Sequence, residues 1–386
     1  MKRMIQAGGV FLLGVVAVTG LGPKELRSRT SAQTRPASAL EVPRFRVEPK
    51  WPTFPSQWTL AITSSTAIDE QDHLWVLQRP NTLSAEEKPR AAPPVLEFDA
   101  EGNFIRAWGG PGPGYDWPSS EHGIYVDPKG FVWIGGQGEE DQLLKFTKAG
   151  TFVMQIGKGG HKKTNQDTKN LWKPADVFVY QKTNELFVAD GYGNKRIIVF
   201  DADTGAFKRM WGAFGKVPMD GPPAPRDPEG PDGPPQFVSP VHAVRVSNDG
   251  FVYVGDRGGR RVQVFTTAGK YVSQVFIGRE CHAPDCGNGT TAAGLAFSQD
   301  PGQRFLFVAN RSQAQVMVFN RKTLEFLDSF GSWGSEPGQF GTLHHLSVDS
   351  KGNLYTAEVT PLKPVNRRVQ KFTLIGLTPV PRSVTQ

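Results

Sequence analysis

The stretch HAVRVSNDGFVYVGDRGGRRVQVFTTAGKYVSQVFIG, residues 242–278, divides into four short strands separated by turns. The second strand, FVYVGD, has an aromatic residue at its centre, Tyr253, and the third, RVQVF, ends in Phe265. The turns are rich in Asn, Asp and Gly, which favour tight reversals of the chain. No apolar spacing typical of a helix occurs in the stretch. It therefore predicts a four-stranded antiparallel unit.

Similar units recur along the chain. Six strands with an aromatic centre lie 48 to 66 residues apart, and their central residues are Trp75, Trp133, Phe187, Tyr253, Phe307 and Tyr355. Four-stranded units repeated at this spacing are typical of a radial arrangement. The sequence thus predicts an all-β fold, a six-bladed β-propeller of four-stranded blades over residues 44–386. The sixth unit runs out after its third strand, and FRVEPKW at 45–51 is expected to supply the missing outer strand.

Composition and charge agree with this fold and exclude other classes. The chain has 386 residues, of which 43 are Gly and 31 are Pro, more than a helical bundle tolerates. The formal net charge is +7. The first 39 residues hold six basic side chains and one acidic one, which leaves +2 on the rest. A nearly neutral body does not indicate a nucleic-acid-binding surface, so no nucleic-acid partner is expected.

The N-terminus is predicted to be an export signal. Lys2 and Arg3 precede an apolar run over about residues 7–21, and the small residues ASA at 37–39 offer a cleavage site. We expect residues 1–39 to be a signal peptide and polar leader, and the mature protein to be periplasmic or extracellular. The apolar run is short and broken by glycine, so no stable membrane span is expected after cleavage. An uncleaved anchor is the alternative.

The chain has two cysteines, Cys281 and Cys286, in the segment ECHAPDCGNG. In an oxidising compartment such a close pair is interpreted as a local disulfide bond. A metal site made of the two cysteines and His282 is the alternative, but it lacks a fourth ligand.

Three histidines occupy the same position in alternate units. His122, His242 and His344 each stand eleven residues before the central aromatic residue of units two, four and six. The corresponding residues of units one, three and five are small, namely Ser64, Ala175 and Ala293. In a propeller these positions begin the innermost strands, so the three imidazoles are expected to converge near the axis. The alternative is three unrelated histidines lining a polar channel.

Three imidazoles without a fourth protein ligand are typical of a catalytic zinc site with an open position. Iron, copper or nickel can use the same ligands, so the expected cofactor is Zn²⁺ or another divalent transition metal.

Further candidate residues follow the second strands of the units. Arg79 in unit one and Tyr192 in unit three are expected on the face that carries the histidines. An arginine there can hold a carboxylate with two hydrogen bonds, and a tyrosine beside a metal and a cation can act as a base. Arg257 is a second cationic candidate. Asp190 and Asp256 are interpreted as structural turn residues. On position alone, Arg79 and Tyr192 can also be rim residues.

The repeats resemble NHL repeats. Together, EHGIYVD, FVADGYGNKRIIVF, SPVHAVRVS, LHHLSVD and LWVLQRP resemble the catalytic domain of peptidyl-α-hydroxyglycine α-amidating lyase, a six-bladed zinc propeller. The match covers nearly everything after the leader. It implies that the zinc histidines are His122, His242 and His344. It places the active-site tyrosine, in a DGY motif, at Tyr192 and the active-site arginine at Arg79.

The resemblance also implies an activity. The expected reaction is cleavage of the C–N bond of a small or peptide-derived N-acyl-α-hydroxyglycine to an amide and glyoxylate. Two departures from the family stand out. The family's Met-Pro-His-Asp motif, whose Asp binds a structural calcium ion, is TLHH at 342–345, so structural Ca²⁺ is doubtful. The family's cysteine after DGY is Gly193, so that disulfide is not expected.

Two other functions fit the same sequence. One is a hydrolase or lactonase that uses the same metal to activate water. The other is a non-enzymatic NHL propeller that acts as a binding module or scaffold, because a fold alone does not establish an activity.

Overall fold

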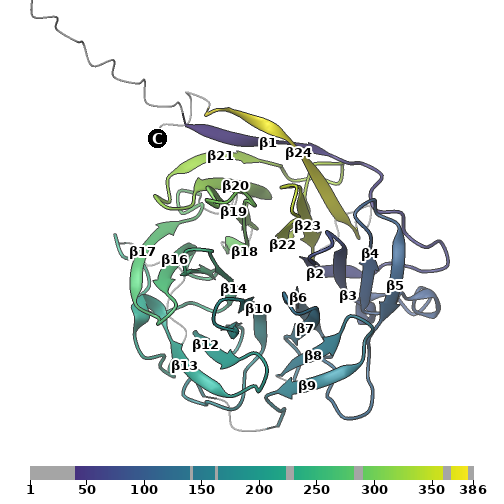
Figure 1. Cartoon of the computed structure of the whole chain (residues 1–386), viewed down its shortest axis with the longest axis horizontal. Helices are drawn as coiled ribbons and strands as arrows, with labels where there is room; N and C mark the ends of the chain where they lie inside the picture. Colours follow the sequence, from purple (N-terminus) through teal and green to yellow (C-terminus); the bar gives the residue numbers. More distant parts are fainter. Residues whose placement is uncertain are drawn as a thin grey trace, which may run out of the picture. The chain divides into compact units, whose positions relative to one another are not determined.

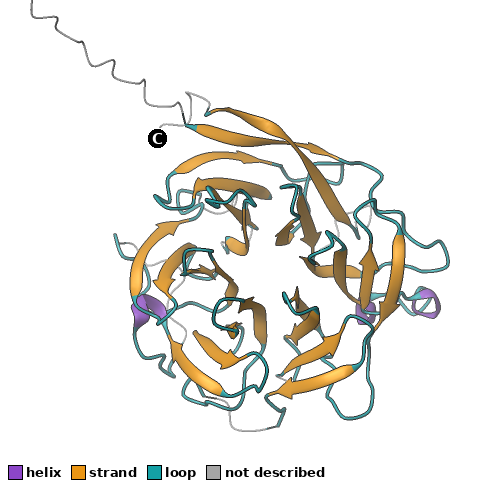
Figure 2. Ribbon diagram, in the orientation of Figure 1, coloured by secondary structure: helices purple, strands orange, loops and turns teal. Residues whose placement is uncertain are grey.

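The computed structural model describes residues 40–139, 142–160, 164–222, 230–281, 290–359 and 367–380. Within these residues, 24 strands form six four-stranded antiparallel sheets. The sheets stand as blades around a common axis (Figures 1 and 2), and the predicted six-bladed β-propeller is confirmed. In each blade we name the strands A to D from the axis outwards.

In each of the first three blades, the strands follow one another along the chain in the order A to D. Blade one consists of β2 (Ile62–Ile68), β3 (Leu74–Arg79), β4 (Val95–Phe98) and β5 (Phe104–Trp108). Blade two consists of β6 (Glu121–Val126), β7 (Phe131–Gly136), β8 (Leu143–Thr147) and β9 (Phe152–Ile156). Blade three consists of β10 (Pro174–Tyr180), β11 (Glu185–Asp190), β12 (Arg196–Asp201) and β13 (Phe207–Trp211).

The last three blades repeat this plan, except that the outermost strand of blade six comes from the other end of the chain. Blade four consists of β14 (Val241–Val246), β15 (Phe251–Asp256), β16 (Arg261–Thr266) and β17 (Tyr271–Phe276). Blade five consists of β18 (Ala292–Phe297), β19 (Phe305–Asn310), β20 (Gln315–Asn320) and β21 (Phe326–Phe330). Blade six consists of β22 (Leu343–Val348), β23 (Leu354–Glu358), β24 (Val369–Pro379) and β1 (Glu41–Val47). In the part of the chain that the structure describes, three short 3₁₀ helices lie in loops, namely η1 (Pro80–Thr82), η2 (Lys88–Arg90) and η3 (Ala213–Gly215).

The ring is closed by pairing between the two ends of the described chain. Strand β1 pairs antiparallel with β24, as the sequence predicts, but it runs from Glu41 to Val47 and not over 45–51. One more backbone hydrogen bond follows the strand, from the N–H of Glu48 to the carbonyl of Lys371 (2.9 Å). The N-terminal segment thus completes the blade that the C-terminal segment begins.

The blades pack through the aromatic centres of their B strands. These six side chains are buried: Trp75, Trp133, Phe187, Tyr253, Phe307 and Tyr355. The indole nitrogens of the two tryptophans find partners in the A–B turns. The Nε1 of Trp75 donates to Asp69 (3.0 Å), and that of Trp133 donates to Asp127 (2.9 Å). Because each buried N–H has a partner, the aromatic residue stabilises both the core and the turn that aligns strands A and B.

Two of the sequence predictions fall on residues outside the described part of the chain. These are the leader at 1–39 and Cys286 of the expected Cys281–Cys286 bond. Both stay predictions. Among the residues described, no helix is both long enough and apolar enough to cross a bilayer.

Candidate metal centre

The A strands are bulged near their starts, where one residue, or two in β18, falls outside the pairing with strand B. In β14 the pairing slips between Val241 and Ala243, so that His242 stands outside the ladder. The same slip occurs at His122 in β6 and at His344 in β22. A bulge redirects a side chain and is frequent beside functional sites. Here it turns three side chains from alternate blades towards the axis.

The structure brings these three histidines together. Their ligand nitrogens lie within 4.8 Å of one another, and their ring centroids are 4.6 to 4.8 Å apart. The Nε2 atoms of His242 and His344 are separated by 3.1 Å. All three side chains are buried. A single ion can therefore contact all three rings.

The bulges of the other three blades orient the imidazoles. The shifted residues there, Ser64, Ala175 and Ala293, each offer a backbone carbonyl to a histidine. The three Nδ1 hydrogen bonds run from His122 to Ala175 (2.8 Å), from His242 to Ala293 (2.5 Å) and from His344 to Ser64 (2.6 Å). A carbonyl only accepts, so each Nδ1 carries the proton and each Nε2 presents a lone pair to the centre. Metal-binding histidines are commonly oriented in this way.

The electrostatics of the cluster favour neutral rings. Burial lowers the pKa of His122, His242 and His344 well below the usual value. The positive charge of Arg257 lowers all three pKa values further, and that of Arg79 lowers those of His122 and His344. Lone pairs on neutral rings repel one another at 3.1 Å unless a cation lies between them. The donor set therefore fits a metal ion.

Tyr192 brings an oxygen to the same centre from the turn after β11. Its hydroxyl lies 2.9 Å from the Nε2 of His122 and 3.2 Å from that of His242. Donor atoms around a tetrahedral zinc ion with bonds of about 2.0–2.1 Å lie about 3.3 Å apart. The three spacings from His122 to Tyr192, from Tyr192 to His242 and from His242 to His344 (2.9, 3.2 and 3.1 Å) are close to those within one coordination shell.

Two arginines lie beside this shell. The Nη1 of Arg257 donates to the Tyr192 hydroxyl (3.1 Å), and its guanidinium lies 5.3 Å from the centre of the tyrosine ring. The Nε of Arg79 donates to the carbonyl of Glu121 (2.6 Å). The Nη2 of Arg79 and the Nε of Arg257 are buried and have no hydrogen-bond partner among the described residues. Both guanidinium groups therefore have an N–H group that can donate a hydrogen bond to an anionic ligand.

The two aspartates interpreted as structural do occupy structural positions. Asp190 pairs with Arg196 and Asp256 with Arg261, each at 2.9 Å and each fully buried. The arginines in turn bind backbone carbonyls of the preceding loops, such as that of Asn170 (2.8 Å) for Arg196. These pairs anchor the loops that surround the site.

Two features of the centre were missed in the sequence. One is the role of the three carbonyl oxygens, although the shared register of the small residues with the histidines is a signal for it. The other is a buried group of Asp176, Arg245 and His345 directly behind the histidines. Asp176 directly follows Ala175, and His345 directly follows His344. These positions in the sequence could have indicated that both side chains also lie near the axis.

Comparisons with known proteins show which families the chain is similar to. No family model matches the chain. NHL repeat-containing protein 3 of Mus musculus is 30% identical over 268 residues, which cover 67% of each chain. Peptidyl-glycine alpha-amidating monooxygenase B of Xenopus laevis is 25% identical over 264 residues, 65% of this chain but 27% of that protein.

A relative from Caenorhabditis elegans is described as a probable peptidyl-alpha-hydroxyglycine alpha-amidating lyase. It is 29% identical over 145 residues, which cover 38% of this chain and 36% of the relative. The homologues thus include amidating lyases as well as NHL repeat proteins. With its six blades and its similarity over two thirds of the mouse protein, the chain belongs to the NHL repeat-containing family.

Proposed function

We propose that this protein is a metal-dependent lyase that cleaves the C–N bond of an N-acyl-α-hydroxyglycine and releases an amide and glyoxylate. The observation that carries the proposal is the position of the Tyr192 hydroxyl. It contacts the Nε2 atoms of His122 and His242 and the guanidinium of Arg257 at 2.9 to 3.2 Å. The similarity to amidating lyases supports the same reaction.

The three histidines would hold the metal through their Nε2 atoms. When bound there, a divalent ion such as Zn²⁺ would act as a Lewis acid and make the substrate hydroxyl more acidic. The carbonyls that bind each Nδ1 keep the rings in the required tautomer, and burial excludes bulk water. In such a buried site, preorganised polar groups would interact with the substrate more strongly than they do in water.

The charges around the centre favour an anionic substrate. Arg257 lies close enough to lower the pKa values of all three histidines and Arg79 to lower those of His122 and His344, and the metal would add further positive charge. A carboxylate on the substrate would compensate this charge. The free Nη2 of Arg79 suits it to bind one carboxylate oxygen, because guanidinium and carboxylate groups match in geometry.

Tyr192 is suited to move the proton. As a phenolate, stabilised by the hydrogen bond from Arg257, it would accept the proton of the substrate hydroxyl. The electron pair of that O–H bond then forms the carbonyl of glyoxylate while the C–N bond breaks and its electrons pass to nitrogen. Tyr192 returns its proton to this nitrogen, which gives the neutral amide. No water is consumed.

The experiment that tests the proposal measures both products. Zinc-loaded protein is incubated with N-benzoyl-α-hydroxyglycine, and glyoxylate and benzamide are expected in equal amounts. Metal-free protein and the Tyr192→Phe variant give the background of spontaneous breakdown. Glyoxylate release no faster than in these controls contradicts the lyase proposal. Ester or lactone hydrolysis by the same zinc-loaded protein would then favour the hydrolase.

A further inference from the structure

The layer directly behind the metal centre contains mostly small side chains. In the six A strands, the residues that follow the shifted position are Ser65, Gly123, Asp176, Ala243, Gly294 and His345. Two of these are large and polar, Asp176 in blade three and His345 in blade six. They reach each other across the axis, with 3.5 Å between an oxygen of Asp176 and the Nε2 of His345.

A guanidinium group fills the space between them. The Nη1 of Arg245, in blade four, lies 2.5 Å from Oδ2 of Asp176, and its Nη2 donates to the Nε2 of His345 at 3.2 Å. The three residues are only 8%, 1% and 2% exposed for Arg245, Asp176 and His345 respectively. One positive charge is thus neutralised by one carboxylate inside the propeller, where an unpaired charge is very unfavourable.

This cluster joins the strands that shape the metal centre. Asp176 directly follows Ala175, whose carbonyl orients His122, and His345 directly follows His344. Oδ2 of Asp176 also accepts the backbone N–H of Val244 at 3.0 Å, two residues beyond His242. The cluster of Asp176, Arg245 and His345 therefore links β10, β14 and β22. It does so next to the residues of these strands that bind the metal or orient a ligand.

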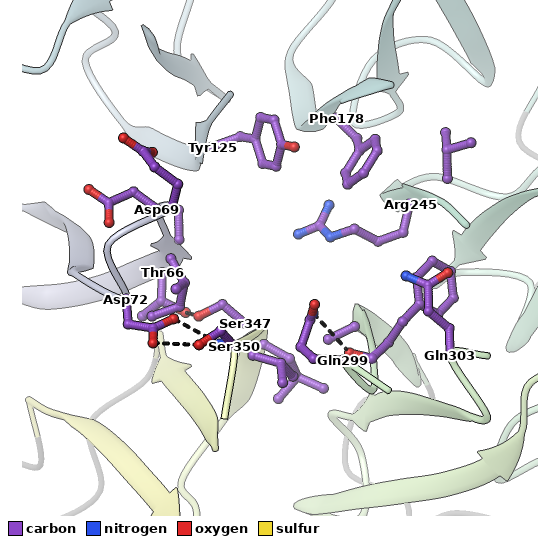
Figure 3. A pocket seen from close by; sticks show the side chains of 18 of the residues that line it. Thr66, Asp69, Asp72, Tyr125, Phe178, Arg245, Gln299, Gln303, Ser347 and Ser350 are labelled. Carbon is purple, nitrogen blue, oxygen red and sulfur yellow. Dashed lines mark hydrogen bonds between the residues drawn. The ribbon is translucent and has the colours of Figure 1, made fainter. Parts of the chain in front are cut away.

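The other side of the cluster faces a cavity. This cavity of about 370 Å³ opens at the far ends of the A strands and is lined by residues including Thr66, Tyr125, Phe178, Arg245 and Ser347. Figure 3 shows the Arg245 side chain reaching towards its middle. Arg245 is the member of the ion pair that lines this cavity. It stands between the opening and the histidines.

We propose that Arg245 is a positioning residue for the metal centre, an internal cation that holds three A strands in the register which the histidine ligands need. The inference rests on the proposed metal site and adds to it a residue that touches neither metal nor substrate. Removal of the guanidinium leaves the carboxylate of Asp176 buried and unpaired, and frees β10, β14 and β22 to shift relative to one another.

The strand link is tested by a double-mutant cycle on metal-free protein. Arg245→Met and Asp176→Asn are each expected to lower the unfolding midpoint by about 5 °C or more, because each leaves one partner of a buried pair alone. The double variant removes both charges and is expected to lose clearly less than the sum of the two. Additive losses, or an Arg245→Met midpoint equal to that of the wild type, would overturn the link.

The positioning role is tested by metal affinity, measured with Co²⁺ absorption and Zn²⁺ competition. Arg245→Met is expected to weaken binding roughly 10- to 100-fold, as changes in groups that orient ligands do. Arg245→Lys keeps the charge and is expected to recover most of the affinity. The matched control is Arg321→Met, which removes another buried arginine, paired with Asp249 at 2.8 Å, in the outer part of blade five. It is expected to lower the midpoint without changing metal affinity.

The outcomes separate this inference from the proposed function. If the wild type and Arg245→Met bind metal equally well, the positioning role is wrong and the lyase proposal stands. If Arg321→Met weakens metal binding as much as Arg245→Met, the effect is general destabilisation and the positioning role is also wrong. If the wild type binds no metal, the proposed function and the positioning role both fail, whereas a non-additive cycle still supports the link between strands.

Discussion

His122 donates the proton on its Nδ1 to the backbone carbonyl of Ala175, 2.8 Å away in the neighbouring blade. The two residues occupy the same shifted position in their A strands. A bulge thus supplies a ligand in one blade and the group that orients it in the next. Repetition of this relationship around the ring produces three imidazoles that all present Nε2 to one point.

Replacement of any one of His122, His242 and His344 with alanine is expected to lower metal affinity by more than about 100-fold and to remove nearly all activity. Loss of a ligand has a larger effect than loss of a group that merely orients one, which costs roughly 10- to 100-fold. The fold is expected to survive because the six blades supply the core. Metal content by elemental analysis and circular dichroism check the two parts.

The matched control for this series is His73→Ala. His73 belongs to a second cluster, with Asp69 and Glu97, but these carboxylates are already paired with Lys148 (2.9 Å) and Arg106 (2.7 Å). The His73 variant is expected to keep one metal ion per chain. Metal that persists in His242→Ala but disappears in His73→Ala would contradict the assignment of the site.

Tyr192→Phe is expected to retain the metal and to lower kcat by about 10²- to 10⁴-fold, because it removes the group that accepts and returns the proton. Tyr115→Phe serves as the control, since its hydroxyl donates to the Gly110 carbonyl (3.0 Å) in the loop between β5 and β6. Single-turnover measurements at saturating substrate compare the two variants. Full activity in Tyr192→Phe would require another base.

Substitutions of Arg79 and Arg257 are expected to change different kinetic constants. Arg79→Lys should raise KM about 10- to 100-fold, because a charged hydrogen bond to the substrate carboxylate is weakened. Arg257→Lys should lower mainly kcat, because Arg257 contacts Tyr192. The control is a substrate whose carboxylate is replaced by an amide. The wild type should bind this amide substrate poorly, and Arg79→Lys should not raise its KM further. If Arg79→Lys raises KM as much for the amide as for the carboxylate substrate, Arg79 does not bind the carboxylate.

The metal-free protein is expected to become less stable as the pH falls below 6.5. Burial lowers the pKa values of the three histidines in the folded state, so below 6.5 the unfolded chain binds more protons than the folded one. Unfolding is then favoured by up to ~1.4 kcal/mol per pH unit for each histidine. Urea unfolding between pH 5 and 7.5 measures the slope. The variant with all three histidines changed to glutamine should show a flatter profile, and an identical profile would show that these histidines do not cause the slope.

Gly191→Ala is expected to disturb the centre through the backbone. A Cβ at Gly191 would lie 1.9 Å from the carbonyl oxygen of Val241, the residue before His242. The contacted atom belongs to the backbone of a fully buried residue and cannot rotate away. Blades three and four would therefore have to move apart. Weaker metal binding and a lower unfolding midpoint should follow. Gly302→Ala is the control, since its nearest neighbour is a side-chain oxygen at 3.4 Å. Equal behaviour of the two variants would contradict this close approach.

The sequence by itself determined the blade count, the use of an N-terminal strand to close the ring and the placement of histidines in alternate blades. Each of these follows from a pattern that repeats within about 50 to 60 residues, such as the aromatic centre of strand B and the position eleven residues before it. In a propeller such a position has one place in every blade, so spacing alone predicts that His122, His242 and His344 meet.

Only the tertiary structure decided which partners these residues have. The carbonyls that orient the histidines lie 51 to 280 residues away along the chain, and their availability depends on bulges in the neighbouring blades. The contact of Arg257 with Tyr192 and the pairing of Arg245 with Asp176 likewise join neighbouring blades. Local spacing predicts the face on which a side chain lies, but side-chain direction and the distance between blades decide what it touches, and these are set by the packing of the whole ring.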